Sequence, residues 1–321
     1  MTTVPRTRLD LTRIEAARRV IDPVFLDTPL YPCDPLGQAL GCRVSVKLET
    51  ANPVRSFKGR GTEVVVSGLS GPAAVCASAG NLGQALAWSA RGRGVAVTVV
   101  ASRSAPAVKL ERIRALGARL ELVDGDFDEA RERAVAIAGH DGIRLVEDSL
   151  DLETCEGAAT IGLELLDTPF DAVLIALGGG AMATGIGHVL KSRAPGVEVV
   201  CVQPAGAPAM TRSWHERRVV TTESTSTIAD GVAGRRPIRE VLDDLLVVAD
   251  DAVLVREESI VAGMRLLLEH AGLVVEPSAA LGVAAVLENR ARFAGRHVAV
   301  VVCGGNVDLP AYHRWLGNGL P

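Results

Sequence analysis

Aromatic residues are scarce in this 321-residue chain, where they make up 3% of the sequence. The net charge is also slightly negative, at −4, with a pI of about 5.9. A protein that binds nucleic acid needs a basic surface, and single strands also need aromatic side chains on which bases stack. The composition therefore excludes nucleic acid as the expected partner.

Paired cysteines are absent as well. The six cysteines are Cys33, Cys42, Cys76, Cys155, Cys201 and Cys303. They have no short paired spacings, which excludes both a zinc-site pattern and a disulfide framework. The six histidines form no ligand spacing either. This cysteine usage fits the reducing cytoplasm, which is the expected location.

Long apolar runs are also missing. The first twenty residues, MTTVPRTRLDLTRIEAARRV, contain no apolar signal-peptide core, and no uninterrupted apolar run reaches the length that spans a bilayer. The protein is expected to be soluble and unexported, without contact to a membrane.

Lysine is the rarest charged residue, because arginine supplies nearly all the positive charge and only Lys47, Lys58, Lys109 and Lys191 are lysines. A lysine, unlike an arginine, can lose its proton and act as a nucleophile or base. Lys58 stands in the stretch RSFKGRG, directly after an apolar run. It is a candidate for chemistry, and from this stretch alone a solvated surface lysine is the alternative.

What the chain does contain is an alternation of short β-branched runs with longer amphipathic segments. The runs cover residues 43–49, 74–78, 95–102, 118–124, 172–178, 197–204 and 297–305. They are apolar on both faces, as are parallel strands that helices cover on both sides. Helices are predicted between them, among others over residues 81–93, 105–117, 128–140 and 257–272. The class is α/β, and the length suits two domains.

Four junctions after predicted strands are rich in glycine or polar residues. They are Ser78-Ala79-Gly80-Asn81, Gly178-Gly179-Gly180-Ala181-Met182, Glu276-Pro277-Ser278-Ala279-Ala280 and Cys303-Gly304-Gly305-Asn306. Ligands bind where strands end and helices begin, because backbone N–H groups there are free. Each junction taken singly is also compatible with an ordinary turn.

Six motifs follow one another along the chain: SFKGRG, SAGNLGQALA, GGGAMATG, TIADGVA, EPSAA and CGGN. In this order they resemble the motifs of the fold-type II pyridoxal-phosphate enzymes. Within that group, the resemblance is to the serine/threonine dehydratase branch, which also contains serine racemase. The resemblance runs from about Leu30 to Asn306. It implies a tryptophan-synthase-β-like fold of two open, twisted, mostly parallel sheets flanked by helices. It also implies a large cofactor-binding domain (residues 1–72 and 151–321), a small substrate-carboxylate domain (residues 73–150), and a homodimer.

The resemblance implies a role for each matching residue. Lys58 would form the Schiff base with pyridoxal 5'-phosphate and then act as the base, Phe57 would lie against the cofactor ring, and Asn81 would bond its hydroxyl. Gly178, Gly179, Gly180, Ala181 and Met182 would hold the phosphate through backbone amides, and Cys303 would face the pyridine nitrogen. The substrate carboxylate would lie on Ser78, Ala79, Gly80 and Asn81.

The implied reaction is α,β-elimination from a β-hydroxy or other β-substituted L-amino acid such as threonine or serine. Lys58 removes the α-proton, the β-substituent leaves, protonated by the cofactor phosphate, and a 2-oxo acid and ammonia result. Because a thiol at Cys303 cannot fix a proton on the pyridine nitrogen as a carboxylate would, the ring is a weaker electron sink, and elimination is favoured over transamination. The enzyme is therefore expected to be a lyase.

Several positions depart from the pattern of the branch. Arg55 replaces a glycine before SFK, Leu82 replaces a histidine, Ala181 replaces a fourth glycine, and Cys155 to Thr160 stand where AGQGT is usual. Ala79 occupies the position of the serine that racemases use on the face opposite the lysine, so racemisation is not expected as the main reaction. Gln203 and Ala209 stand at or near the places of two metal-binding carboxylates, so no magnesium or calcium site is expected.

Some questions stay open at this point. Two alternatives are a β-replacement enzyme of the cysteine-synthase kind and a non-catalytic regulator that binds cofactor or amino acid. A nicotinamide-binding protein is not expected, because the sequence lacks the early glycine fingerprint of such proteins. The sequence ends soon after CGGN, so no regulatory domain is expected. Glu276 is either a site carboxylate or a helix-start charge, and Asp230 is a turn or interdomain residue. The natural β-substituent and any monovalent cation are undetermined.

Overall fold

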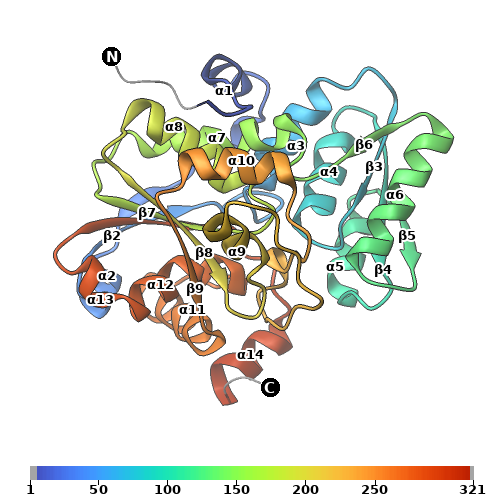
Figure 1. The fold of residues 1–321 in the computed structure, drawn as a ribbon. Helices are drawn as coiled ribbons and strands as arrows, with labels where there is room; N and C mark the ends of the chain where they lie inside the picture. Colours follow the sequence, from blue (N-terminus) through green and yellow to red (C-terminus); the bar gives the residue numbers. More distant parts are fainter. Residues whose placement is uncertain (1–5, 319–321) are drawn as a thin grey trace.

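A computed structural model describes residues 6–318 of the chain, which form two β-sheets with helices packed around them (Figure 1). The larger sheet has the strand order β1-β2-β10-β7-β8-β9. Its strands are β1 (Leu30–Pro32), β2 (Arg43–Leu48), β10 (His297–Val302), β7 (Ala172–Ala176), β8 (Glu198–Pro204) and β9 (Asp251–Val255). All neighbouring pairs are parallel except β1 with β2.

The larger sheet is buried on both faces. Every residue of β7 is buried, as is nearly all of β8 and β10, which explains why these strands read as continuous apolar runs rather than alternating ones. In Figure 1, α7 (Leu152–Leu165), α8 (Ala181–Arg193) and α10 (Arg239–Val248) lie on one side of the sheet, and α11 (Glu257–Ala271) and α12 (Leu281–Glu288) on the other.

The smaller sheet has the order β5-β4-β3-β6, and all its pairs are parallel. Its strands are β3 (Ala73–Ala77), β4 (Ala96–Ser102), β5 (Arg119–Val123) and β6 (Arg144–Val146). Side chains alternate along β3 as the pleat requires: Ala74 and Cys76 pack with α4 (Asn81–Arg91), and Val75 and Ala77 pack with α6 (Phe127–Asp141).

The remaining helices complete the layers. They are α1 (Leu11–Ala17), α2 (Asp34–Leu40), α3 (Lys58–Ser67), α5 (Ala107–Ala115), α9 (Ala209–Glu216), α13 (Arg290–Phe293) and α14 (Leu309–Asn318), with 3₁₀ turns η1 (Pro23–Phe25), η2 (Asp230–Val232) and η3 (Pro277–Ala280). Within residues 6–318, none of these helices has the length and apolar character needed to cross a bilayer.

The α/β class is confirmed, and each predicted strand and helix is present. The prediction missed β1, β6 and β9. β1 and β6 are three residues long, which is too short for periodicity to stand out, and β9 lies at a sheet edge with partly exposed residues.

Parallel pairing brings the ends of β2, β10 and β7 to one edge of the larger sheet. Val302 pairs with Leu48, and Val300 pairs with Leu174. The loops that follow these strands therefore start side by side, as the rule for open α/β sheets requires of a ligand site.

Candidate active site

Lys58 is the first residue of α3, and backbone contacts fix its place beside the end of β10. The Phe57 N–H donates to the carbonyl oxygen of Cys303 at 3.1 Å, and Ser56 forms an antiparallel bridge with Gly304. These contacts bring the stretch around Lys58 against the CGGN segment, although almost 250 residues separate the two in sequence.

The Lys58 side chain is largely buried, with 16% of it exposed. Its Nζ donates to Oδ2 of Asp148 at 2.6 Å and lies 4.6 Å from the centroid of the Phe57 ring. Phe57 itself is 8% exposed. The ammonium is thus held between a carboxylate and an aromatic face.

The other three lysines are engaged elsewhere. Lys47 is fully buried and paired with Glu164, Lys109 is paired with Asp230, and Lys191 is paired with Asp250. Because Lys47 has no exposure to solvent, no small molecule reaches its nitrogen in this fold. Lys58 is the lysine at the carboxyl edge of the larger sheet.

A buried ion-pair cluster anchors the start of α3. The guanidinium of Arg60, two residues beyond Lys58, donates to Glu49 at 2.8 Å and to Glu164 at 2.5 Å, and Lys47 also pairs with Glu164. Two cations thus face two carboxylates, so the charge is balanced, as a buried cluster requires. The same contacts hold the pKa of Glu164 down at about 2, against the burial that raises it. The cluster fixes the helix that carries Lys58.

The loop from Gly178 to Met182 joins β7 to α8. Gly180 has φ +110°, and a Cβ there would lie 2.5 Å from Val241 Cγ1; a Cβ on Gly179 would lie 2.6 Å from Ser149 Oγ. At Gly180 the left-handed backbone favours glycine, and at Gly179 a Cβ would force the Ser149 hydroxyl to move.

The backbone N–H groups of this loop have few partners. The Ala181 N–H donates to Ser149 Oγ at 3.1 Å. Within residues 6–318, the amides of the three glycines and of Met182 have no acceptor. A row of free amides at a helix N-terminus is a binding site for a phosphate or another anion.

The loop from Ser78 to Asn81 follows β3 and ends at the first residue of α4. The Ser78 N–H donates to Val100 O at 3.0 Å, and the Gly80 N–H donates to Ser78 Oγ at 3.1 Å. In the part of the chain that the structure describes, the amides of Ala79 and Asn81 are left without an acceptor. This loop is therefore a second candidate anion-binding site, formed by the amides of Ala79 and Asn81. The Ser78 hydroxyl does not face this site, because it accepts the hydrogen bond from the Gly80 N–H of the same loop.

A polar network joins Asn81 to the CGGN segment through Glu276. The Asn81 amide donates to both Glu276 oxygens, at 2.9 and 3.1 Å, and Asn306 donates to Asn81 Oδ1 at 2.9 Å and from its backbone to Glu276 at 3.3 Å. These bonds fix the orientation of the Asn81 amide. Glu276 is 6% exposed, so its carboxylate is buried in this network and is not a surface charge.

Burial controls the ionisation of this network. Burial raises the pKa of Glu276 to about 7, although the hydrogen bond from Asn81 works against this. Burial, together with the negative Glu276, also raises the pKa of the Cys303 thiol well above its usual range. Cys303, which is 4% exposed, is therefore a neutral thiol near pH 7.

Sequence reasoning missed Asp148, Ser149 and Asn306. Asp148 and Ser149 follow β6, and the rule that ligand groups lie at the carboxyl ends of parallel strands would have pointed to them. The signal was lost because the three-residue strand β6 was not predicted. Asn306 lay inside the CGGN junction, but its side chain had no assigned role.

Asp230, the predicted turn or interdomain residue, begins η2 and pairs with Lys109 of α5. It thereby links the segment that carries the smaller sheet to a loop of the larger one.

Gln203 and Ala209, the two positions that the resemblance relates to metal-binding carboxylates, are engaged in packing. Gln203 is buried, and its Oε1 accepts from the Thr211 N–H at 2.9 Å; Ala209 is buried at the start of α9. Residues 6–318 contain no group of three or more histidine, cysteine, aspartate or glutamate side chains placed to bind a metal ion.

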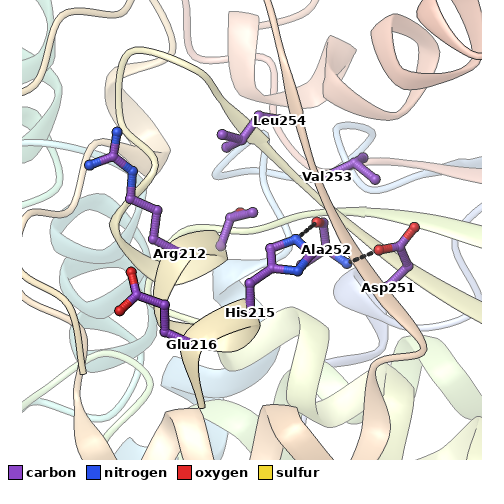
Figure 2. A pocket seen from close by; sticks show the side chains of 8 residues that line it. Arg212, His215, Glu216, Asp251, Ala252, Val253 and Leu254 are labelled. Carbon is purple, nitrogen blue, oxygen red and sulfur yellow. Dashed lines mark hydrogen bonds between the residues drawn. The ribbon is translucent and has the colours of Figure 1, made fainter. Parts of the chain in front are cut away.

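A separate groove lies between α9 and the edge strand β9 (Figure 2). It is formed by Thr211, Arg212, His215, Glu216 and residues 251–254, and it contains neither Lys58 nor any residue of the two amide loops. Nε2 of His215 lies 2.8 Å from the carbonyl oxygen of Ala252 and covers part of the open edge of β9. This contact protects a sheet edge and has no connection to Lys58.

Comparison with known proteins gives a consistent result. Residues 21–304 match the family described as "Pyridoxal-phosphate dependent enzyme". An L-threonine ammonia-lyase of Thermotoga maritima is 35% identical over 97% of this chain and 79% of its own length. A catabolic L-threonine dehydratase of Staphylococcus aureus is 32% identical over 97% of this chain and 93% of its own.

Solved structures with the same fold include a threonine deaminase of T.th., with a TM-score of 0.89, 32% identity, and coverage of 94% of this chain and 99% of that one. Maize serine racemase also has a TM-score of 0.89, with 27% identity and coverage of 94% and 95%.

Proposed function

We propose that this chain, which belongs to the pyridoxal-phosphate-dependent enzyme family, is an ammonia-lyase that carries out α,β-elimination on a β-substituted L-amino acid such as threonine or serine. The observation that carries the proposal is the position of Lys58 beside two loops of free backbone amides at the carboxyl edges of the sheets. The names of the relatives at 32–35% identity agree with this reaction.

The residues present fit the cofactor. The amides of Gly178, Gly179, Gly180 and Met182 are free to bind its phosphate, and the glycines leave the space that a Cβ would fill. Phe57 would lie against the ring, the fixed amide of Asn81 would donate to the ring hydroxyl, and Cys303 would face the ring nitrogen. When bound, pyridoxal phosphate supplies an aldehyde for the amino group and a conjugated ring that stabilises charge at the α-carbon.

Lys58 would act as both anchor and base. As a free amine it is within reach of the α-carbon side of the site, where it can take the α-proton. The free amides of Ala79 and Asn81, at the start of α4, would hold the substrate carboxylate within the loop from Ser78 to Asn81. With the carboxylate and the α-amino group both held, the α-proton is directed at Lys58.

Two residues favour elimination over other reactions of an α-amino acid. The neutral thiol of Cys303 would not deliver a proton to the ring nitrogen of the bound cofactor, which would keep the ring a weaker electron sink and favour loss of the β-substituent. The methyl group of Ala79 cannot return a proton from the opposite face. The products would be a 2-oxo acid and ammonia.

We also propose that residues 1–72 and 151–321 form the cofactor-binding domain and residues 73–150 a small domain. In support, every strand of the smaller sheet falls between Ala73 and Val146. We further propose a cytoplasmic homodimer. The six unpaired cysteines are compatible with a reducing compartment, and light scattering of the purified protein tests the dimer.

The function is tested by incubating the cofactor-loaded protein with a panel of L-amino acids that carry different β-substituents. Release of 2-oxo acid is followed with a coupled dehydrogenase, and ammonia is measured separately. Equal amounts of both from threonine or serine, absent in Lys58→Ala, support a lyase. If 2-oxo acid falls and a new amino acid forms when sulfide is added, the enzyme is a β-replacement enzyme instead. No turnover of any member of the panel contradicts the proposal.

A further inference from the structure

Asp148 is a carboxylate that the proposed reaction does not yet use. It lies in the loop between β6 and α7, its Oδ2 accepts from Lys58 Nζ at 2.6 Å, and its side chain is 30% exposed. Its other oxygen, Oδ1, is buried and has no donor among the residues that the structure describes. A carboxylate oxygen without a donor is costly, and because the side chain as a whole is 30% exposed, it can turn this oxygen towards a hydrogen-bond donor on a bound small molecule.

The position of Asp148 brings this residue beside the loop that we propose holds the substrate carboxylate. Cys76 of β3 pairs with Val146 of β6 in parallel register. Ser78 and Asp148, each two residues further on, therefore leave neighbouring strands at the same edge of the smaller sheet, and such strands lie about 5 Å apart. A small amino acid whose carboxylate lies on the Ser78 loop has its β-carbon within reach of Asp148.

Asp148 also borders the phosphate loop. Its Oδ2 lies 3.9 Å from the place that a Cβ would take on Gly179, and the next residue, Ser149, accepts from the Ala181 N–H. The carboxylate therefore lies between Lys58 and an anion site, and further negative charge at this place would be repelled.

The charge of Asp148 is compensated by Lys58, its ion-pair partner within residues 6–318. To remove an α-proton, however, Lys58 must be a neutral amine. When Lys58 is neutral, the Asp148 carboxylate has no cationic partner. A cationic group on the substrate then restores an ion pair at Asp148.

We propose that Asp148 determines specificity for the β-substituent: it favours L-amino acids with an ammonium group on the β-carbon over those with a hydroxyl, and it disfavours a β-carboxylate. This inference rests on the proposed elimination. In the step, the α-C–H bond breaks and its proton goes to Lys58, the electron pair forms the Cα=Cβ bond, and the β-C–N bond breaks to release ammonia. Water then hydrolyses the remaining enamine to a 2-oxo acid and a second ammonia.

The test compares kcat/KM for L-2,3-diaminopropionate, L-serine and L-threo-3-hydroxyaspartate in the wild type, Asp148→Asn and Asp148→Ser. Glu147→Gln is the matched control, because it removes a charge one residue away that pairs with Arg131. In the wild type, diaminopropionate should be preferred over serine by about tenfold or more and give two ammonia per 2-oxo acid, and hydroxyaspartate should be the poorest substrate. Both Asp148 variants should lose most of the preference, mainly through KM, and Glu147→Gln should keep it.

A second measurement separates specificity from loss of structure. Titration of the cofactor-free proteins with pyridoxal phosphate, followed by fluorescence quenching, should give dissociation constants for the Asp148 variants no weaker than that of the wild type, because the removed charge borders the phosphate loop. The Asp148 assignment is overturned if the variants lower kcat/KM for serine and diaminopropionate by the same factor, or if the wild type prefers serine. A wild type that processes none of these amino acids overturns the proposed function, and the Asp148 assignment with it.

Discussion

Replacing Glu276 with glutamine should change the pH dependence of stability in a direction that the structure fixes. Burial raises the pKa of Glu276 to about 7 in the folded protein, from an ordinary value of 4.5. A carboxyl group whose pKa is raised by folding stabilises the folded state while it is protonated. Its contribution is complete below about pH 4.5 and is lost as the pH rises towards about 7. At about 1.4 kcal/mol for each pH unit between the two values, the loss is about 3 kcal/mol.

Glutamine has nearly the same shape but does not ionise. Its NH₂ group must face either the Asn81 amide or the Asn306 N–H, both of which donate to Glu276, so the variant is also destabilised by about 1–3 kcal/mol at every pH. The free energy of unfolding of the wild type minus that of Glu276→Gln should therefore be largest at the acid end of the range and smaller by about 2–3 kcal/mol at pH 8 than at pH 5. His188, whose pKa burial lowers, titrates in both proteins and cancels in the difference.

The assay is urea unfolding of the cofactor-free proteins between pH 5 and pH 8, followed by tryptophan fluorescence and circular dichroism. Glu15→Gln is the control, because Glu15 forms an exposed ion pair with Arg193 and such a pair contributes about 1 kcal/mol or less. Parallel pH curves for the wild type and Glu276→Gln, or a difference that grows with pH, would refute the assignment of Glu276 as a buried carboxyl group with a raised pKa.

Three further outcomes test the site. Borohydride reduction of the yellow protein, which should absorb near ~410 nm, followed by peptide mapping should place the label on Lys58; a label on Lys47, Lys109 or Lys191 would be incompatible with this site. In deuterated water, unreacted L-substrate should show little conversion to the D-enantiomer because Ala79 carries no acid, and racemisation as fast as 2-oxo acid release would show that another group serves that face. Cys303→Ser should keep elimination within about tenfold, or roughly 1.4 kcal/mol in barrier, and a loss far beyond that would mean that more than a neutral hydrogen-bonding group is required there.

The sequence by itself determined the elements that depend on local patterns. Runs apolar on both faces identified β2, β7, β8 and β10 as strands of a covered parallel sheet. The glycine and polar junctions indicated that helices open within residues 78–81 and 178–182, where α4 and α8 begin. Lys58 stood out because lysine is rare in this chain. Its link to pyridoxal phosphate came from the order of six motifs and not from any single one.

The tertiary structure decided which groups meet. Asp148 contacts Lys58 although 90 residues separate them, and Asn81 contacts Glu276 across 195 residues. These contacts follow from the strand order and from the short strand β6, and hydrophobic periodicity carries no information on strand order. From the sequence, Glu276 could be a surface charge or a site carboxylate, and its burial excludes the surface charge. Lys47 and Lys58 are the same residue type, but Lys47 lies in a buried ion-pair cluster and Lys58 lies at the edge where parallel strands end. The packed fold, and not the residue type, therefore determines which lysine nitrogen a ligand can reach.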